Sequence, residues 1–310
     1  MKHPVRVAIT IRSFDLQGPA NKKLLEQCTI SFANTSGRRL SEDELIEAVS
    51  GCSGVIAGTE TFSARVIRQS PLLKIISRVG VGTDSIDLNE AHAQGIRVAT
   101  TPNSPIQAVA EHTIALLLSS LKRIPQYNEQ MRRNNHAVVA GSLLSGKTVG
   151  IAGLGRVGSR VAEQLACLGC RICFYDPWFS KEKPPSWTQY DSLEALVQDV
   201  DILSIHSAPL ADGSPLITDE VLSHAKGITI INTARGTLID EQALIRSLSS
   251  GAVKSAALDV FPSEPYTGKL LGFPQVIVTP HVASNTGESR SLMEMEAADN
   301  LIQYLKEVDA

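Results

Sequence analysis

The feature that most constrains the fold of this chain is a glycine-rich turn, Gly153-Leu154-Gly155-Arg156-Val157-Gly158. It lies between an apolar run at residues 149–152 and an amphipathic helical pattern at residues 158–168. Glycines at this spacing allow a tight turn, close approach of a pyrophosphate, and close packing of a helix on its strand. The spacing alone is a weak signal, because Gly80-Val81-Gly82 is also glycine-rich and follows a strand-like run. The order strand, turn and helix nevertheless predicts a dinucleotide-binding unit.

An acidic residue follows this unit where a bound dinucleotide would need one. Asp176 comes directly after a strand-like run at residues 171–175, where a carboxylate would meet a ribose 2′-hydroxyl. The carboxylate would accept hydrogen bonds from a free ribose diol and repel a 2′-phosphate, and Pro177 and Trp178 supply no arginine. We therefore expect the cofactor to be NAD rather than NADP. The alternative is that Asp176 only ends a strand in solvent.

The order of apolar patterns predicts an α/β chain with two domains, since 310 residues exceed the usual size of one domain. In the first third, short strand-like runs alternate with helical patterns, which predicts a small doubly wound unit of parallel strands. The strand-like runs are at 5–10, 54–57, 73–77 and 96–99, and the helical patterns at 41–49, 64–69 and 87–94. A long connecting helix is expected to begin at Ser104-Pro105-Ile106-Gln107, with Ser104 as its N-cap.

The second part of the chain carries the pattern of a complete Rossmann domain. Its strand-like runs are at 149–152, 171–175, 202–206, 228–232, 256–260 and 276–279. Its helical patterns are at 158–168, 193–197, 219–224 and 241–249, and the tail from about residue 288 is helical again.

Composition narrows the class of protein. The apolar fraction of 43% with 20% charged residues is ordinary for a globular chain, and a net charge of −3 gives no reason to expect nucleic acid or an anionic membrane as a partner. The N-terminus lacks the pattern of a secretory signal, and five cysteines cannot all pair, so we expect a cytoplasmic protein without disulfides. The run Cys167, Cys170 and Cys173 resembles a metal-ligand pattern, but a helix-to-strand transition would separate the three sulfurs, so no metal is expected.

Three short stretches supply the candidate chemistry: Asn232-Thr233-Ala234-Arg235-Gly236, Leu258-Asp259-Val260-Phe261-Pro262-Ser263-Glu264-Pro265 and Thr279-Pro280-His281. Arg235 offers a planar, permanently charged fork for a carboxylate at the end of a strand, although a surface ion pair is the simpler reading of one arginine. His281 can donate and accept a proton near neutral pH, and a hydrogen bond to Glu264 would orient its imidazole and favour the protonated form. The alternative is that His281 is a core histidine and Glu264 a loop acid.

Together, these motifs and the glycine turn resemble the D-isomer-specific 2-hydroxyacid dehydrogenase family, from about Leu73 to nearly the C-terminus, and phosphoglycerate dehydrogenases are the most similar members. The resemblance implies a Rossmann NAD-binding domain at 99–285, inserted in a smaller flavodoxin-like doubly wound substrate domain at 1–98 and 286–310, with the active site in the cleft between them. It also implies hydride transfer between NAD(H) and a D-2-hydroxy acid or its 2-keto partner.

The resemblance assigns roles to individual residues. It implies that Arg235 orients the substrate, that His281 handles the proton, and that Glu264 acts through His281. The expected cofactor-binding residues are Gly153, Gly155, Arg156, Val157, Gly158, Asp176, His206, Ser207, Thr233, Ala234 and Asp259, with Asp259 near the nicotinamide. The expected substrate-binding residues are Arg78, Val79, Gly80, Val81, Asn103 and Arg235. Arg78 would suit a phosphorylated substrate, unless it only braces its loop by pairing with Asp84 or Asp87.

Partners and alternatives also follow from the resemblance. The polar region 123–142 corresponds to an arm that packs on a second subunit, so a homodimer through the NAD-binding domain is expected, although 132–141 lacks the expected aromatic residue. Because the sequence ends at Ala310, we expect a short form without regulatory domains. A glyoxylate, hydroxypyruvate or D-lactate-type reductase is the enzymatic alternative. An NAD-sensing binding protein, similar to corepressors of this fold, is the alternative from another class.

Overall fold

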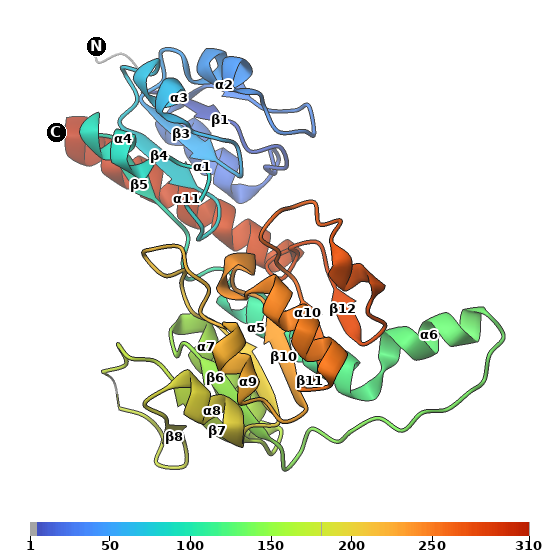
Figure 1. The fold of residues 1–310 in the computed structure, drawn as a ribbon. Coiled ribbons are helices and arrows are strands. Elements are labelled where there is room, and N and C mark those ends of the chain that lie inside the picture. The colour runs from blue at the N-terminus through green and yellow to red at the C-terminus, as the bar shows by residue number, and fades with distance from the viewer. Residues whose placement is uncertain (1–4, 181, 310) are drawn as a thin grey trace. The chain divides into compact units, whose positions relative to one another are not determined.

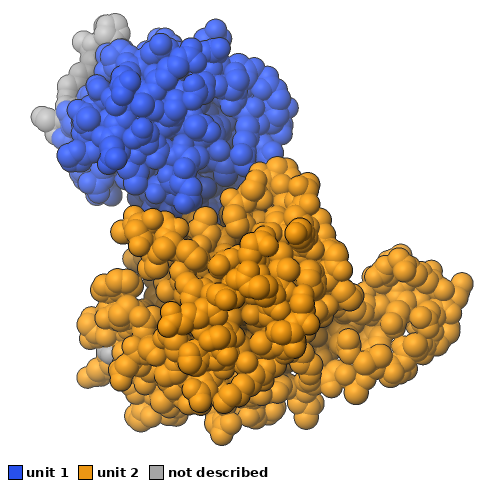
Figure 2. Space-filling model, in the orientation of Figure 1, with its two compact units in different colours: residues 1–105, 285–310 blue, residues 106–284 orange. Residues whose placement is uncertain are grey.

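The structure, a computed structural model, describes residues 5–180 and 182–309. The chain forms two compact units, unit 1 with Met1–Pro105 and Asn285–Ala310, and unit 2 with Ile106–Ser284 (Figure 2). The first boundary between the two units lies after Pro105 rather than at the predicted residue 99, because the segment 100–105 is hydrogen-bonded to other residues of unit 1. Thr101 N donates to Gly80 O (3.0 Å), and Asn300 Nδ2 donates to Thr100 O (3.0 Å).

Unit 1 is built on a parallel five-stranded sheet in the order β2-β1-β3-β4-β5 (Figure 1). The strands are β1 (Arg6–Ile9), β2 (Thr29–Ala33), β3 (Gly54–Ala57), β4 (Ile75–Arg78) and β5 (Arg97–Ala99). The helices are α1 (Pro19–Gln27), α2 (Glu42–Val49), α3 (Ala64–Arg68), α4 (Leu88–Ala93) and α11 (Gly287–Asp309). This strand order is that of flavodoxin-like folds, so the predicted architecture of this unit is confirmed.

Alternation of side chains along the strands divides the core of unit 1 between the two faces of its sheet. Val7 and Ile9 pack with buried residues of α1 and α11, including Leu301. Ala8, between them in β1, faces the other way and packs with buried residues of α2, α3 and α4. Both sheet faces are therefore covered by helices, which is what a doubly wound parallel sheet requires.

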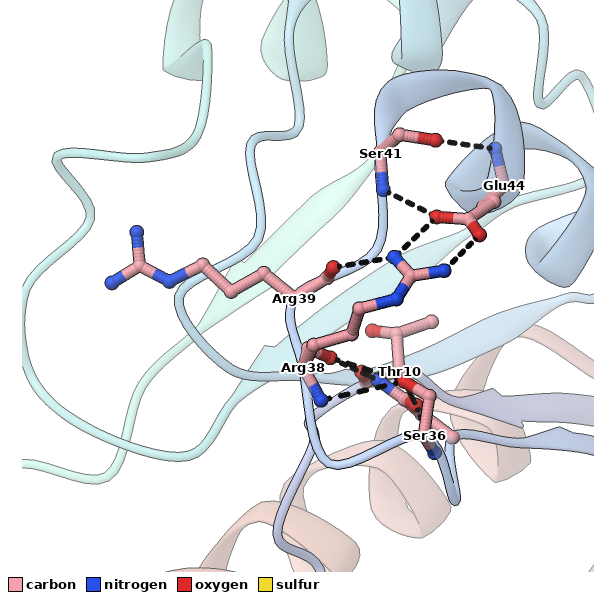
Figure 3. Close-up of polar contacts among 7 residues, drawn as sticks. Thr10, Ser36, Arg38, Arg39, Ser41 and Glu44 are labelled. Atoms are coloured by element: carbon pink, nitrogen blue, oxygen red, sulfur yellow. Dashed lines mark hydrogen bonds and ion pairs between the residues drawn. The ribbon is translucent and has the colours of Figure 1, made fainter.

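Two elements of unit 1, α1 and β2, were not predicted from the sequence. The N-cap of α1 is Gly18, which makes no side-chain capping bond, and β2 lies at the sheet edge with no fully buried side chain. By contrast, α2 begins with a complete capping box of Ser41 and Glu44. The preceding loop is also bonded to Glu44, because Arg38 Nη1 donates to its carboxylate (2.9 Å), while the Arg39 side chain points away from this cluster (Figure 3).

Unit 2 is built on a parallel seven-stranded sheet in the order β12-β11-β10-β9-β6-β7-β8. The strands are β6 (Thr148–Ala152), β7 (Arg171–Tyr175), β8 (Thr188–Gln189), β9 (Ile202–Ile205), β10 (Ile228–Asn232), β11 (Val253–Leu258) and β12 (Val276–Val278). Strand order reverses between β6 and β9, as in a Rossmann domain, so this part of the fold prediction is confirmed too. The helices are α5 (Ile106–Lys122), α6 (Ile124–Arg132), α7 (Arg156–Cys167), α8 (Leu193–Asp199), α9 (Asp219–Ser223) and α10 (Glu241–Ser250), with short 3-10 helices η1 (Gly236–Leu238) and η2 (Lys269–Gly272).

Local predictions for unit 2 and for the residues just before it differ from the structure at several places, including β11, which spans Val253–Leu258 rather than 256–260, and the unpredicted edge strand β8. Helix α7 begins at Arg156 rather than 158, because Gly155 is its N-cap. Helix α6 lies in the polar region 123–142, where no helix was predicted; it and the segment at 133–143 extend away from the rest of unit 2 (Figure 1). Ser104, expected to cap α5, donates its hydroxyl to Glu296 of α11.

The described residues also bear on metal and membrane sites. Cys167, Cys170 and Cys173 are free thiols on α7, in the following loop and on β7. Among residues 5–180 and 182–309 there is no cluster of three histidine, cysteine or acidic side chains placed to hold a metal ion. In the same residues, no helix is both long enough and apolar enough to span a bilayer.

Candidate active site

In the turn after β6, two of the three glycines lie close to other backbone atoms, and the third faces open space. A Cβ on Gly153, whose φ is +93°, would lie 2.8 Å from the backbone of Ser207, and a Cβ on Gly158 would lie 2.0 Å from Gly153 O. A Cβ on Gly155 would meet nothing within 4 Å. Gly155 therefore leaves open space at the N-terminus of α7, which fits the approach of a dinucleotide pyrophosphate. Arg156 and Val157 follow as the first residues of that helix.

Asp176, directly after β7, is bonded to this turn. One carboxylate oxygen accepts a hydrogen bond from Leu154 N (2.8 Å), and the other accepts one from Trp178 N (3.0 Å). Two backbone donors thus hold the carboxylate beside the glycines. The acid that the sequence assigns to the ribose lies next to the turn assigned to the pyrophosphate.

His206 and Ser207 follow β9, the strand on the other side of β6. The His206 ring lies 2.8 Å from Ser204 Oγ, measured at Nε2. Desolvation by the surrounding protein lowers the pKa of His206 to about 4. The imidazole is therefore neutral at neutral pH and adds no charge to the turn.

Arg235 stands in a loop fixed by the residues on both sides of it. Asn232 accepts a hydrogen bond from Ala234 N (3.0 Å) and donates one to Arg235 O (2.9 Å). Gly236 lies so close to the next strand's loop that a Cβ would be 1.9 Å from the carbonyl carbon of Phe261. Arg235 Nη1 donates to Ala234 O (2.8 Å), and the side chain is half-buried. The guanidinium is thus held by a rigid loop at the carboxyl end of β10.

Thr233, in the same loop, contacts the long helix of unit 2. Its hydroxyl lies 2.8 Å from the hydroxyl of Thr113 on α5, and both residues are buried. This bond ties the Arg235 loop to α5.

Glu264 and His281 form a directly bonded pair. His281 Nδ1 lies 2.9 Å from Glu264 Oε2, and Glu264 Oε1 accepts a hydrogen bond from Phe261 N (3.1 Å). The His281 and Glu264 side chains are 48% and 38% exposed, so the pair is accessible. His281 has a φ of +55°, in the left-handed region that few residues other than glycine adopt. With Nδ1 facing the carboxylate, Nε2 is the ring atom available for a substrate oxygen.

A buried carboxylate fixes the turn that carries His281. Asp259 is fully buried and accepts hydrogen bonds from the Thr279 hydroxyl (2.5 Å), Val282 N (2.9 Å) and Ala283 N (2.8 Å). Its backbone carbonyl accepts from His281 N (2.8 Å). Burial acts to raise the pKa of Asp259, but the hydrogen bonds to its carboxylate, above all the one from the His112 side chain, outweigh this effect, so the pKa is lowered. The expected role of Asp259 beside a nicotinamide stays a prediction; in this structure it organises the His281 turn.

His112 completes this network and was not among the predicted site residues. Its Nε2 lies 3.2 Å from the Thr279 hydroxyl and 3.5 Å from Asp259 Oδ1. The sequence separation between His112 and Thr279 is 167 residues, so no local pattern could have shown the contact.

The predicted substrate loop lies in unit 1, at the end of β4. Arg78 Nη1 donates to Val79 O (2.9 Å), and Gly80 N donates to the Thr101 hydroxyl (2.8 Å). Gly80 has a φ of +134°, and a Cβ there would lie 1.5 Å from Arg78 Nη1, so only glycine lets the guanidinium fold back over the loop. Val81 is exposed.

Two acids of unit 1 lie beside the predicted substrate residues. Glu60 is buried, which raises the pKa of its carboxyl group. The hydrogen bond from Gly58 N and the positive charges of Arg78 and Arg39 partly offset this rise. Sequence reasoning did not identify Glu60 as a neighbour of Arg78. Asn103 is exposed and its Nδ2 lies 3.4 Å from Glu296 Oε1.

Comparison with known proteins places these features in one family. A sequence profile described as D-isomer specific 2-hydroxyacid dehydrogenase, NAD binding domain, matches residues 114–283, more than half of the chain. The chain belongs to this family. The matched region covers the glycine turn and all three stretches that carry Arg235, Glu264 and His281.

Similar members of the 2-hydroxyacid dehydrogenase family include enzymes with a named activity. The chain is 36% identical over 265 residues to D-3-phosphoglycerate dehydrogenase of Mycobacterium tuberculosis, which covers 84% of this chain and 50% of that protein. The chain thus spans about half the length of the curated relatives it matches.

Two solved structures cover nearly the whole chain. The TT0316 protein from Thermus thermophilus is 31% identical, with a TM-score of 0.87, over 98% of this chain and 97% of its own. The NADPH-dependent glyoxylate/hydroxypyruvate reductase of Sinorhizobium meliloti, in complex with NADP and malonate, is 28% identical, with a TM-score of 0.85, over 98% of this chain and 94% of its own.

Proposed function

We propose that this chain is an NAD-dependent D-2-hydroxyacid dehydrogenase that transfers a hydride between NAD(H) and a 2-hydroxy or 2-keto acid. The observation that carries the proposal is the bonded pair of Glu264 and His281, which follows β11 and β12, next to the Arg235 loop after β10. These strands are neighbours in one parallel sheet, so their carboxyl ends lie at one edge. The glycine turn after β6 opens at the same edge, where ligands of open α/β sheets bind.

Each proposed role follows from the chemistry of the side chain. The Arg235 fork binds the substrate carboxylate and directs the keto group toward His281. NADH, when bound, supplies the hydride to the keto carbon. His281 donates a proton from Nε2 to the resulting alkoxide, and takes it back in the oxidation direction. Glu264 accepts the Nδ1 hydrogen bond, which fixes the orientation of the ring and leaves Nε2 for the substrate oxygen.

The simplest test is to assay the protein with NADH and a panel of 2-keto acids. Purified protein with NADH should reduce at least one 2-keto acid from a set that includes phosphohydroxypyruvate, hydroxypyruvate, glyoxylate and pyruvate. Binding of NADH without oxidation on any of these acids would instead support the NAD-sensing alternative.

Cofactor choice is predicted to depend on Asp176. Its replacement by alanine should weaken NAD binding and reduce the discrimination against NADP, because the carboxylate that meets the ribose diol and repels a 2′-phosphate is lost. Titration of NADH and NADPH into both proteins, followed by nucleotide fluorescence, measures the change. Equal use of the two nucleotides by the unaltered protein would contradict the assignment of NAD.

We propose phosphohydroxypyruvate and 3-phosphoglycerate as the substrate pair, supported by the similarity to phosphoglycerate dehydrogenases and by Arg78. The buried acid Glu60 beside Arg78 favours a second candidate, an unphosphorylated acid such as hydroxypyruvate or glyoxylate. A carboxylate that interacts electrostatically with that guanidinium offsets part of the positive charge that a phosphate would use.

Arg78→Ala separates the two substrates. A charge-assisted contact to phosphate would make kcat/KM for phosphohydroxypyruvate fall by roughly tenfold to a hundredfold, while the value for hydroxypyruvate changes little. Steady-state kinetics on both acids provide the comparison. An equal loss on both would mean that Arg78 braces its loop, and would remove the reason to prefer a phosphorylated substrate.

We also propose a homodimer that forms through unit 2. Helix α6 and the segment at 133–143 extend from this unit (Figures 1 and 2). Met131, Val138 and Leu143 in this region are exposed. An apolar groove of about 490 Å³ between α5 and α7, lined by Ile114, Leu118 and Leu168 among others, offers a surface for the same segment of a second copy. Light scattering on the full chain tests the assembly. A cytoplasmic location also stays a prediction.

A further inference from the structure

One aromatic side chain stands exposed directly after the acid assigned to the cofactor ribose. The side chain of Trp178 is 77% exposed, and it is the one aromatic residue among the exposed large hydrophobic residues that the described part of the chain contains. The next residue, Phe179, turns inward and packs edge-on against Phe174 of β7, with ring centroids 5.1 Å apart. Of these two neighbouring aromatic side chains, Phe179 therefore packs against the core and Trp178 faces solvent.

The backbone holds Trp178 beside Asp176. Trp178 N donates to one carboxylate oxygen of Asp176 (3.0 Å), and the other oxygen accepts from Leu154 N of the glycine turn (2.8 Å). Pro177 between them restricts the chain further. If Asp176 binds the adenosine ribose, an indole therefore follows that carboxylate two residues later in the chain. The adenine is bonded directly to the ribose, so the base would lie about one sugar ring away from the Asp176 carboxylate.

We infer that the indole of Trp178 stacks on the adenine ring of the bound dinucleotide. This inference rests on the proposed use of NAD(H) and names a binding residue for the half of the cofactor that is remote from hydride transfer. A purine offers a flat face of the size of an indole, and stacking of a base on an aromatic side chain is favourable and independent of hydrogen bonding. The pairing gives the exposed indole an apolar partner when the cofactor is present.

Binding of cofactor fragments tests the inference without any turnover. Trp178→Ala should raise the dissociation constants of NADH and of 5′-AMP by roughly 5- to 100-fold, the range expected for loss of one base–aromatic stack. Nicotinamide mononucleotide, which lacks adenine, should bind both proteins equally. Trp178→Phe should retain most of the affinity for AMP, because a phenyl ring still stacks. Isothermal titration measures all three ligands.

Fluorescence supplies an independent readout, since the chain contains two tryptophans and the other one, Trp187, is buried. AMP should quench the emission of the wild-type protein, and Trp178→Phe should abolish this quenching although AMP still binds. AMP absorbs too far in the ultraviolet to accept energy from an indole, so quenching reports contact.

The outcomes separate this inference from the proposed function. If the wild-type protein binds NADH and AMP, and Trp178→Ala binds both with unchanged affinity, stacking is ruled out while the cofactor assignment stands. If the wild-type protein binds neither ligand, the proposed function fails and the inference fails with it. Because the side chain is exposed, the variant should keep the wild-type circular dichroism spectrum and melting temperature.

Discussion

Replacement of His281 by alanine is expected to lower the turnover of 2-keto acid reduction by roughly 10²- to 10⁴-fold, the usual scale for loss of a general acid. The physical reason is that the alkoxide formed by hydride addition would have no positioned proton donor once the imidazole is removed. The ring is bonded to Glu264 at an accessible site, so the dissociation constant of NADH should change little. Steady-state kinetics and nucleotide titration on the same preparation measure both quantities.

The matched control is His224→Ala, since His224 is an exposed histidine at the C-cap of α9. This variant should keep wild-type turnover. Near-normal turnover of His281→Ala would show that the proton comes from another group, and would end the proposed mechanism. A parallel loss of NADH affinity would instead point to collapse of the turn held by Asp259.

Gly158→Ala is expected to have the second largest effect, on cofactor binding. The added Cβ would lie 2.0 Å from Gly153 O, so either the start of α7 or the glycine turn must move. Overpacking of this kind costs on the order of 1 to 3 kcal/mol, which corresponds to a loss of NADH affinity of roughly 5- to 150-fold if the strain falls on the binding-competent turn. Nucleotide fluorescence measures the loss of NADH affinity of the variant, and thermal unfolding measures its loss of stability.

Two other glycines serve as controls for this substitution. Gly155→Ala meets nothing within 4 Å in the structure, so it should leave the melting temperature unchanged and still weaken NADH binding by filling the space for the pyrophosphate. Gly272→Ala also meets nothing within 4 Å and lies at the end of η2, so it should alter neither property. Wild-type NADH affinity in Gly158→Ala would contradict the placement of the pyrophosphate at this turn.

Much of the fold could be predicted because its signals are local. The strands β3, β7 and β10 begin and end where the apolar runs do, since each is a fully or mostly buried parallel strand between clear turn residues. The residues Arg235, Glu264 and His281 could be selected because each follows a predicted strand within a few residues. Parallel strands that are neighbours then bring their loops to one edge without further information.

The parts that could not be predicted depend on contacts between distant segments. His112 joins Asp259 and Thr279 from another helix, and nothing in the sequence around it distinguishes it from a packed helical histidine. The proximity of Glu60 to Arg78 depends on how the loops after β3 and β4 fold. Edge strand β2 lacks buried side chains, so its pattern carries little of the signal that marks the central strands.

The most direct test of the central claim is the fate of the hydride. A 2-keto acid from the active set is reduced with NADH that carries deuterium at both C4 positions, and the product is examined by mass spectrometry and chiral chromatography. The expected product is a D-2-hydroxy acid with one deuterium at C2, formed by the wild-type protein and not detectably by His281→Ala on the same time scale. A product without deuterium, or an L-2-hydroxy acid, would contradict the proposed function.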